Sequence, residues 1–539
     1  MHYSLLLCIA LILVVSMLVM LGQRLRISYP IFLVLGGLAI SFIPGLPSIT
    51  IDPELIFLIF LPPLLFEAAW MTSWKAFWKW RRVITMLAFG FVLITSTVVA
   101  FVSTALIPGF TLAMGFLLGA IISPPDAVAA TSVLKGVNIP KPLTQILEGE
   151  SLVNDASSLI VFRFAVAAIM TGTFVFQKAA VSFVLVAVMG VVIGLAIALI
   201  IYAMYRWLPT TTSIDIALSF IAPYLMYLTA ESFHYSGVMA VVSGGLFLSY
   251  HSHVTLSHQS RLQGYAMWNT ITFILNGLVF MLIGLEMPEI MRNLGDYSKG
   301  RAIFYGVVIS LVIIVTRIIT ALFTAGWTKL IGRWITVADQ NPGWRGPIVI
   351  GWAGMRGVVS LASALSIPLL LKNGQPFPYR SLILCITFIV ILITLVLQGL
   401  TLPWVIKLVG LDKEQQGSSE QEEEAKLHHQ LLTAAVSHLE EQYTDLMKKQ
   451  PVLQNLYNQM KNDLQLTANF LEGHGAGEKE RQSSLVYNSI YLELLGTQRQ
   501  RLFQLRDRDQ FEDELIRKVE GQLDLEQEKL LRENGHGHH

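Results

Sequence analysis

Charge is scarce in this sequence. Only 14% of the 539 residues are charged, and the formal net charge is +1, whereas soluble domains carry roughly a quarter charged residues. A chain without a basic surface lacks the electrostatic footprint of a nucleic-acid-binding protein, so nucleic acid is not expected as a partner. The low charge, together with a hydrophobic fraction of 54%, excludes an ordinary soluble domain and predicts a membrane protein.

Cysteines and the signatures of enzyme sites are also scarce. The two cysteines, Cys8 and Cys385, both lie in long apolar runs, where a thiol behaves as a small buried hydrophobe. Two such residues provide neither a disulfide framework nor a thiolate metal site. No H-E-x-x-H zinc helix occurs, and no Ser/His pair lies in the middle of an apolar run. We therefore expect neither an enzyme nor a bound cofactor.

The acidic residues are distributed unevenly along the chain. Of the 37, 24 follow position 410, which leaves 13 in the first 410 residues. The sequence thus divides into an apolar body, residues 1–410, and a charged tail, residues 411–539. We expect the tail to be mostly helical and cytoplasmic and to pack on itself or on a second copy, with a regulatory ligand or partner as the alternative. The last histidines, His536, His538 and His539, are expected to be an uncommitted tail or weak metal ligands.

Apolar stretches of about 20 residues, the length of a membrane-spanning helix, recur thirteen times in the body. They run at about 3–22, 29–43, 53–71, 83–107, 112–134, 142–170, 180–205, 214–233, 236–251, 266–286, 303–328, 346–371 and 379–409. The predicted fold is therefore an all-α membrane protein. When the tail is placed in the cytoplasm, 14 of the 20 Lys and Arg residues in the loops fall on the inner side, as the positive-inside rule requires. An odd number of crossings then leaves the N-terminus outside.

One carboxylate lies well inside the sixth apolar stretch, where ionisable groups are costly and by default mark a functional path. It is Asp155, in the segment GESLVNDASSLIVF. Ser151 is four residues earlier on the same helix face, and Asn154 is its neighbour. Oxygen ligands suit a hard alkali cation, and a carboxyl group removed from water holds a proton more readily. This pattern favours a shared cation and proton site over the alternative, an Asp paired with an Arg for packing.

Two apolar stretches contain helix-breaking residues next to a charge. Asp126 follows Pro124 and Pro125 in ISPPDAV, and Arg356 lies among three glycines in GWAGMRGVVS. Broken backbone at membrane depth is tolerated only around a protein-lined or wet cavity. Paired breaks are typical of transporters built from inverted repeats. Here the two repeats would be the first six and the last six apolar stretches. The alternatives are an N-cap for Asp126 and a purely structural counter-ion for Arg356.

Two further charges fall in apolar stretches. Glu67 follows two prolines in FLPPLLFEAAW, and we expect it to be either a cation ligand or an interfacial anchor beside Trp70 and Trp74. Arg163, two turns after Asp155, is expected to balance charge in the core.

The segments FLPPLLFEAAW, ISPPDAVAA, LEGESLVNDA and WAGMRGVVSLASALSIP together resemble the bacterial monovalent cation:proton antiporters, which are related to the mammalian sodium/hydrogen exchangers. The resemblance covers essentially all of residues 1–410, and GESLVND is its most specific element. It implies a homodimer of thirteen-helix subunits in the lipid bilayer, in which a six-helix core moves against a dimerisation half as an elevator.

The same resemblance implies roles for individual residues. Asp155 matches the exchange carboxylate of the family, and Asn154 matches its partner. Ser151, Asp126 and Glu67 match additional groups of the ion site. Asp155, Asp126 and Ser151 are thus the implied sodium ligands.

Charge partners in the core follow by analogy. Glu150 is expected to pair with a core arginine, which we assign to Arg356, and Arg317 in IVTRIIT matches a second core arginine. One position departs from the family: relatives usually have Thr where this chain has Pro125, so only a backbone carbonyl is available there. This departure leaves the cation preference open.

The implied function is exchange of sodium for protons across the cell membrane, in which Asp155 releases its proton when sodium binds. Family members with an Asn-Asp pair tend to be electroneutral, so one cation is expected per proton. Lithium or potassium in place of sodium stays open, because the same scaffold serves these ions. An ion channel is the alternative from another class, and it would need a continuous pore.

Overall fold

The computed structural model describes residues 2–25, 27–43, 53–134, 137, 139–172, 176–292, 294, 297–332, 339, 343–371, 374–411, 420–471, 478–507 and 513–535. Within these ranges nearly every residue is helical, and Leu370 and Pro376 form an isolated bridge. The chain divides into two compact units, Met1–Lys413 and Glu414–His539. The division falls close to position 410, after which the acidic residues accumulate.

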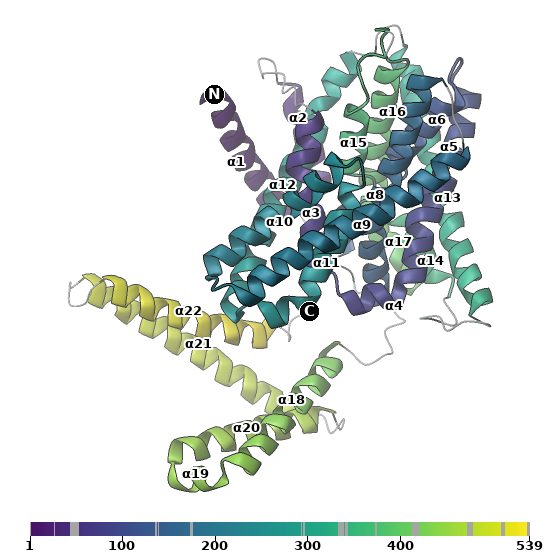
Figure 1. The fold of residues 1–539 in the computed structure, drawn as a ribbon. Coiled ribbons are helices and arrows are strands. Elements are labelled where there is room, and N and C mark those ends of the chain that lie inside the picture. Colours follow the sequence, from purple (N-terminus) through teal and green to yellow (C-terminus); the bar gives the residue numbers. More distant parts are fainter. Residues whose placement is uncertain are drawn as a thin grey trace. The chain divides into compact units, whose positions relative to one another are not determined.

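The first unit is a bundle of helices, coloured from purple to green in Figure 1. In chain order its elements are α1 (His2–Arg24), α2 (Tyr29–Ser41), α3 (Pro53–Met71), α4 (Trp74–Thr85), the π-helix η1 (Met86–Phe91), α5 (Val92–Leu106), α6 (Leu112–Ile122), α7 (Ala127–Leu134), α8 (Lys141–Thr171), α9 (Phe176–Trp207), α10 (Thr212–Ser232), α11 (Gly237–Thr255), α12 (His258–Arg292), α13 (Lys299–Ile331), α14 (Arg345–Trp352), α15 (Val358–Leu365), α16 (Arg380–Ile393), the π-helix η2 (Thr394–Gln398) and α17 (Gly399–Val409). Each predicted stretch overlaps at least one of these helices. Among the helices of the described ranges, eight are long and apolar enough to cross a membrane, and three shorter apolar ones accompany them. The unit is an all-α, multi-pass membrane protein.

Small residues bring these helices close together, as is common for helices packed in a membrane. α5 packs against α6 where Gly119 faces Ser96, and a Cβ added at Gly119 would lie 2.6 Å from the Cα of Ser96. α2 and α12 meet in the same way at Gly37 and Gly284. A larger residue at these glycines would push the helix pairs apart.

The fifth and twelfth predicted stretches are broken helices. Residues 123–126 separate α6 from α7, and residues 353–357 separate α14 from α15. The two non-helical segments cross, and the amide of Asp126 donates a hydrogen bond of 2.7 Å to the carbonyl of Met355. At the crossing, a Cβ on Gly357 would collide with the Asp126 carboxylate, so only glycine permits this approach. Both breaks predicted from the sequence are confirmed.

Two π-helices, which the sequence analysis did not predict, lie beside the segments that carry the buried charges. η1 joins α4 to α5, and η2 joins α16 to α17. The Ser157 hydroxyl of α8 donates to the Ala88 carbonyl of η1 at 2.6 Å. The amide of Arg356 donates to the Thr394 hydroxyl of η2 at 3.2 Å. π-Turns occur preferentially at functional sites, and these contact the helices around the crossing.

The second unit is also helical. Its elements are α18 (Glu420–Gln442), α19 (Thr444–Lys449), α20 (Pro451–Leu471), α21 (Glu478–Asp507) and α22 (Asp513–Gly535). α18 packs against α20, and Tyr457 donates a hydrogen bond of 2.7 Å to Glu440 between them. α21 packs against α22. The terminal histidines His536, His538 and His539 lie outside the described residues.

Candidate functional site

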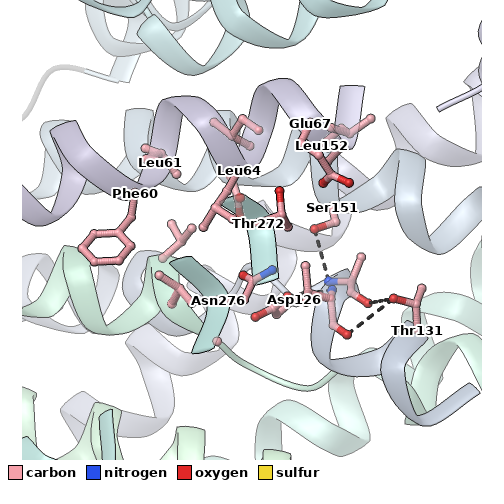
Figure 2. Close-up of a pocket in the computed structure, with 18 of the residues that line it drawn as sticks. Phe60, Leu61, Leu64, Glu67, Asp126, Thr131, Ser151, Leu152, Thr272 and Asn276 are labelled. Carbon is pink, nitrogen blue, oxygen red and sulfur yellow. Dashed lines mark hydrogen bonds between the residues drawn. The ribbon is translucent and has the colours of Figure 1, made fainter. Parts of the chain in front are cut away.

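A cavity of about 600 Å³ lies where α3, α8 and α12 meet the broken helices. Figure 2 shows its two ends: Phe60, Leu61 and Leu64 make one end apolar, and Glu67, Ser151 and Asp126 gather at the other. A water molecule occupies about 30 Å³ of liquid, so the cavity has room for a cation that still carries water. The polar end is where such a cation would exchange water for protein oxygens.

Asp126 is the link between the two broken helices. Its carboxylate accepts hydrogen bonds from the amides of Val128 at 2.8 Å and Ala129 at 3.4 Å, so it caps the N-terminus of α7. The amide of Val358, in the first turn of α15, also bonds to it. Two helix N-termini therefore stabilise this negative charge. Asp126 lines the cavity as well, so the N-cap role and a place in the site coexist.

α8 supplies the remaining groups of the polar end. Asp155 is 7% exposed and lines the cavity with Ser151, one turn earlier. The carboxylates of Asp155 and Asp126 interact electrostatically. The Ser151 hydroxyl accepts a bond of 3.3 Å from the amide of Ala127, which ties α8 to α7. Two carboxylates facing one low-dielectric cavity repel each other, and either a proton or a cation relieves the repulsion.

Asn154 lies behind the cavity wall. It is fully buried, and its amide nitrogen donates to the carbonyl of Pro125 at 3.4 Å. Its side-chain oxygen has no hydrogen-bond partner among the described residues. Pro125 itself lines the cavity. Asn154 thus holds the broken segment against α8, next to Asp155, and is not one of the residues that line the cavity.

α12 contributes cavity residues that the sequence analysis missed. Asn269, Thr272 and Asn276 recur at spacings of three and four residues, so they share one face of α12, and all three line the cavity. The Thr272 hydroxyl is buried without a partner among the described residues. Figure 2 shows Thr272 and Asn276 near Asp126. The signal that identifies them is this helical spacing of polar residues within an apolar run.

The expected pairing of Glu150 with Arg356 is wrong. Both oxygens of Glu150 accept hydrogen bonds from Arg317, at 2.8 and 3.0 Å, in a bidentate ion pair. Both side chains are almost fully buried. Arg317 also donates to the carbonyl of Ile350 at 3.2 Å, near the C-terminal end of α14. It therefore neutralises Glu150 and stabilises the negative end of a half-helix.

Arg356 stabilises the C-terminal end of α6, as Arg317 stabilises that of α14. Its guanidinium donates to the carbonyl of Ser123, the C-cap residue of α6, and it is fully buried. Both guanidiniums also lie over the ring of Phe91 in η1, with centroid distances of 4.9 Å for Arg317 and 5.7 Å for Arg356. At the crossing, an acid thus faces the N-termini of the half-helices, and arginines face their C-termini.

Arg163 does not balance charge in the core, contrary to expectation. Its guanidinium pairs with Glu231 of α10 at 2.5 Å, and the two side chains are 44% and 27% exposed. The pair lies between α8 and α10 at the edge of the bundle.

No group of three or more His, Cys, Asp or Glu side chains is close enough to hold a metal ion within the part of the chain that the structure describes. The acids of the cavity are spread around it and do not form a tight cage.

Comparisons with known proteins place these features in a family. A family model described as the transmembrane sodium/hydrogen exchanger matches residues 9–408. The chain is 36% identical over 389 residues to the sodium, potassium, lithium and rubidium/H(+) antiporter of Bacillus pumilus, and the match covers 70% of this chain and 57% of that protein. It is 38% identical over 381 residues to the protein of the same description from Bacillus subtilis, covering 68% of this chain and 56% of the relative. The chain thus spans just over half the length of these two relatives.

A solved structure has the same fold. The sodium proton antiporter MjNhaP1 from Methanocaldococcus jannaschii superimposes with a TM-score of 0.61 at 19% identity, covering 76% of this chain and 99% of that one. Residues 9–408, which the family model matches, include both broken helices, the residues that line the cavity and the pair of Glu150 and Arg317. The chain belongs to the sodium/hydrogen exchanger family.

Proposed function

We propose that this chain is a secondary antiporter that exchanges sodium for protons across the cell membrane, with Asp155 as the site that the two ions share. The observation that carries the proposal is the polar end of the cavity, where Asp155, Asp126 and Ser151 meet at the crossing of two broken helices. Oxygen ligands of this kind suit an alkali cation. Glu67 and the carbonyl of Pro125 complete the set. The names of the two Bacillus relatives include sodium, potassium, lithium and rubidium, and the first three are the ions that the sequence left open.

Competition for one carboxylate explains why the two ions move in opposite directions. When sodium reaches Asp155 the proton leaves, and when sodium departs a proton returns, so the site does not carry both. Glu150, Arg317 and Arg356 contribute no ligand to the cavity; they neutralise the dipoles and charges of the crossing. With Asn154 next to Asp155 instead of a second acid, one proton is exchanged for one cation. The exchange is then electroneutral.

The architecture fits alternating access. Thirteen crossings, with the N-terminus outside and the tail in the cytoplasm, would place the broken helices at matching positions in two inverted six-helix repeats. In this arrangement the cavity lies between the core, which contains Asp126 and Asp155, and the dimerisation half, which contains Glu67 and the polar face of α12. Movement of the core as an elevator, within a homodimer, would carry the site from one side of the membrane to the other.

The activity is tested with the full chain in proteoliposomes that contain a pH-sensitive dye. Sodium added outside should raise the internal pH as protons leave, and lithium and potassium tested in turn should rank the three cations, with choline as the inactive control. A potential-sensitive dye should stay silent during sodium-driven proton movement. A change of potential would contradict one-for-one exchange, and currents far above exchanger turnover would favour a channel.

Gly357→Ala is expected to raise the apparent KM for sodium by about tenfold, because the added Cβ would collide with the Asp126 carboxylate. Turning that carboxylate away removes a cation ligand from the site, and a tenfold loss of affinity corresponds to about 1.4 kcal/mol of binding free energy. Gly326→Ala is the matched control, since an added Cβ there meets nothing within 4 Å. The dye assay across a sodium series measures both variants. An unchanged KM in Gly357→Ala would mean that Asp126 does not bind the cation.

A further inference from the structure

α4 carries a concentration of positive charge that the proposed exchange does not use. Within Trp74–Thr85 the sequence WKAFWKWRRVIT holds four basic residues and no acid. The helix lies at the start of the apolar span Trp74–Leu106. On its packed side Trp80 and Ile84 are buried, whereas Trp74 and Trp78 are 37% and 53% exposed. A basic amphipathic helix with exposed indoles at the end of a span is typical of the membrane interface.

The exposed side of α4 is an ordered surface. The rings of Trp74 and Trp78 stack with centroids 5.5 Å apart. The Arg81 guanidinium lies 4.4 Å from the centroid of Trp78 and donates to the Trp78 carbonyl at 2.6 Å. Lys75 and Lys79 are exposed one turn apart on the same helix. Ordered indoles beside two ammonium groups form a surface that is both apolar and cationic.

Neither lysine is paired with an acid within the described ranges, although the Lys79 ammonium lies 5.6 Å from the centroid of the Trp80 ring. Among the described residues, the ion pairs of the chain do not include Lys75 or Lys79. Like charges one turn apart on a helix repel each other and destabilise it. An anion bound between the two ammonium groups would remove this repulsion.

We propose that the exposed side of α4 binds the headgroups of anionic phospholipids. Lys75 and Lys79 contact the phosphate oxygens, and the indoles of Trp74 and Trp78 lie at the level of the headgroups. A lipid fits better than a soluble anion, because the indoles present apolar area that favours the bilayer interface and because α4 continues directly into a membrane span. This inference does not depend on the exchange activity.

The location of α4 connects such a lipid to the helix that carries Asp155. α4 and η1 contact α8 on both sides of Asp155: at Gly149, where an added Cβ would lie 2.5 Å from Ile84, and at Ser157, which bonds to η1. A headgroup held by α4 therefore lies on the element that fixes the position of α8.

The test is lipid binding by the purified full chain in a neutral detergent. Native mass spectrometry measures the affinity for phosphatidylglycerol and for phosphatidylcholine of the same chain length. Each lysine at an anionic surface is worth roughly a fivefold gain in affinity, so removing two should cost about 25-fold. We expect Lys75→Gln/Lys79→Gln to bind phosphatidylglycerol about 25-fold more weakly than the wild type does and to bind phosphatidylcholine with unchanged affinity. Lys75→Arg/Lys79→Arg keeps both charges and should still prefer phosphatidylglycerol.

Lys299→Gln/Arg301→Gln, which removes two exposed charges at the start of α13, is the matched control and should retain the preference. An inorganic phosphate series separates a lipid site from a simple anion site. The proposal is overturned if the glutamine variant of α4 binds phosphatidylglycerol as tightly as the wild type does. Displacement of the lipid by millimolar phosphate would also overturn it, because the site would then recognise the anion alone.

Discussion

Asp155→Asn is expected to abolish sodium-driven proton movement while leaving a folded protein. Asn has the same size as Asp and fits the same place on α8, but it can neither release a proton nor offer a negative charge to a cation. Asp155 is only 7% exposed and faces the cavity. Removing one partner of a buried charged interaction costs about 2–5 kcal/mol, so the exchange rate should fall by about a hundredfold or more, to the leak of empty vesicles.

The pH-dye assay in proteoliposomes measures the Asp155→Asn effect, and size-exclusion chromatography of the solubilised variant checks its folding. Asp215→Asn is the matched control. Asp215 is also a buried carboxylate of the first unit, 6% exposed, and it accepts a hydrogen bond of 2.7 Å from Ser260. It does not line the cavity, so its variant should retain exchange. Transport by Asp155→Asn at a rate near that of the wild type would refute the assignment of Asp155 as the shared site.

The sequence identifies the parts of the site that depend on local pattern. Consecutive prolines before Asp126 and three glycines around Arg356 break helices wherever they occur in an apolar run, and the structure breaks both helices there. Ser151 and Asp155 share a helix face through their spacing of four residues, and both line the cavity. These features need no knowledge of which helices are neighbours.

The partner of Glu150 depends on tertiary structure, and this explains the error in its assignment. Arg317 lies 167 residues away in the chain, and no periodicity distinguishes it from Arg356 as a partner. The positions of the two arginines are decided at the crossing of the broken helices. There Arg356 donates to the carbonyl of Ser123, and Arg317 donates to the carbonyl of Ile350. Each arginine follows the half-helix C-terminus that it stabilises.

Other parts of the site could not be predicted from the sequence for a different reason. Uncharged polar residues are common in membrane helices, so Thr272 and Asn276 do not stand out until α12 is placed against the cavity. A π-turn adds one residue to a helical turn without a distinctive composition, and so η1 and η2 were not predicted. Arg163 carries the same charge as the core arginines, and only its exposure shows that it lies at the edge.

Breaking the pair between Glu150 and Arg317 is expected to be the most destabilising change in the first unit. Removing one member of a buried ion pair leaves an uncompensated charge and costs about 3–5 kcal/mol. Both Glu150→Gln and Arg317→Met should therefore lower the melting temperature of the solubilised protein. Arg163→Gln is the matched control: its pair with Glu231 is partly exposed, and such surface pairs contribute about 0–1 kcal/mol.

The two single variants should differ, because Arg317 has a second bond. Glu150→Gln leaves Arg317 bound to the Ile350 carbonyl, whereas Arg317→Met leaves both Glu150 and that carbonyl without a partner. An unsatisfied buried acceptor adds about 1–3 kcal/mol to the loss. Glu150→Leu/Arg317→Met removes both charges, and a buried pair replaced by apolar residues of similar volume is often close to neutral. This variant then loses only the bond to the Ile350 carbonyl, at a cost of about 1–3 kcal/mol. The melting temperatures should thus rank wild type, double variant, Glu150→Gln and Arg317→Met from highest to lowest. A double variant less stable than either single variant would show that the pair stabilises the fold beyond the cost of its unpaired charges.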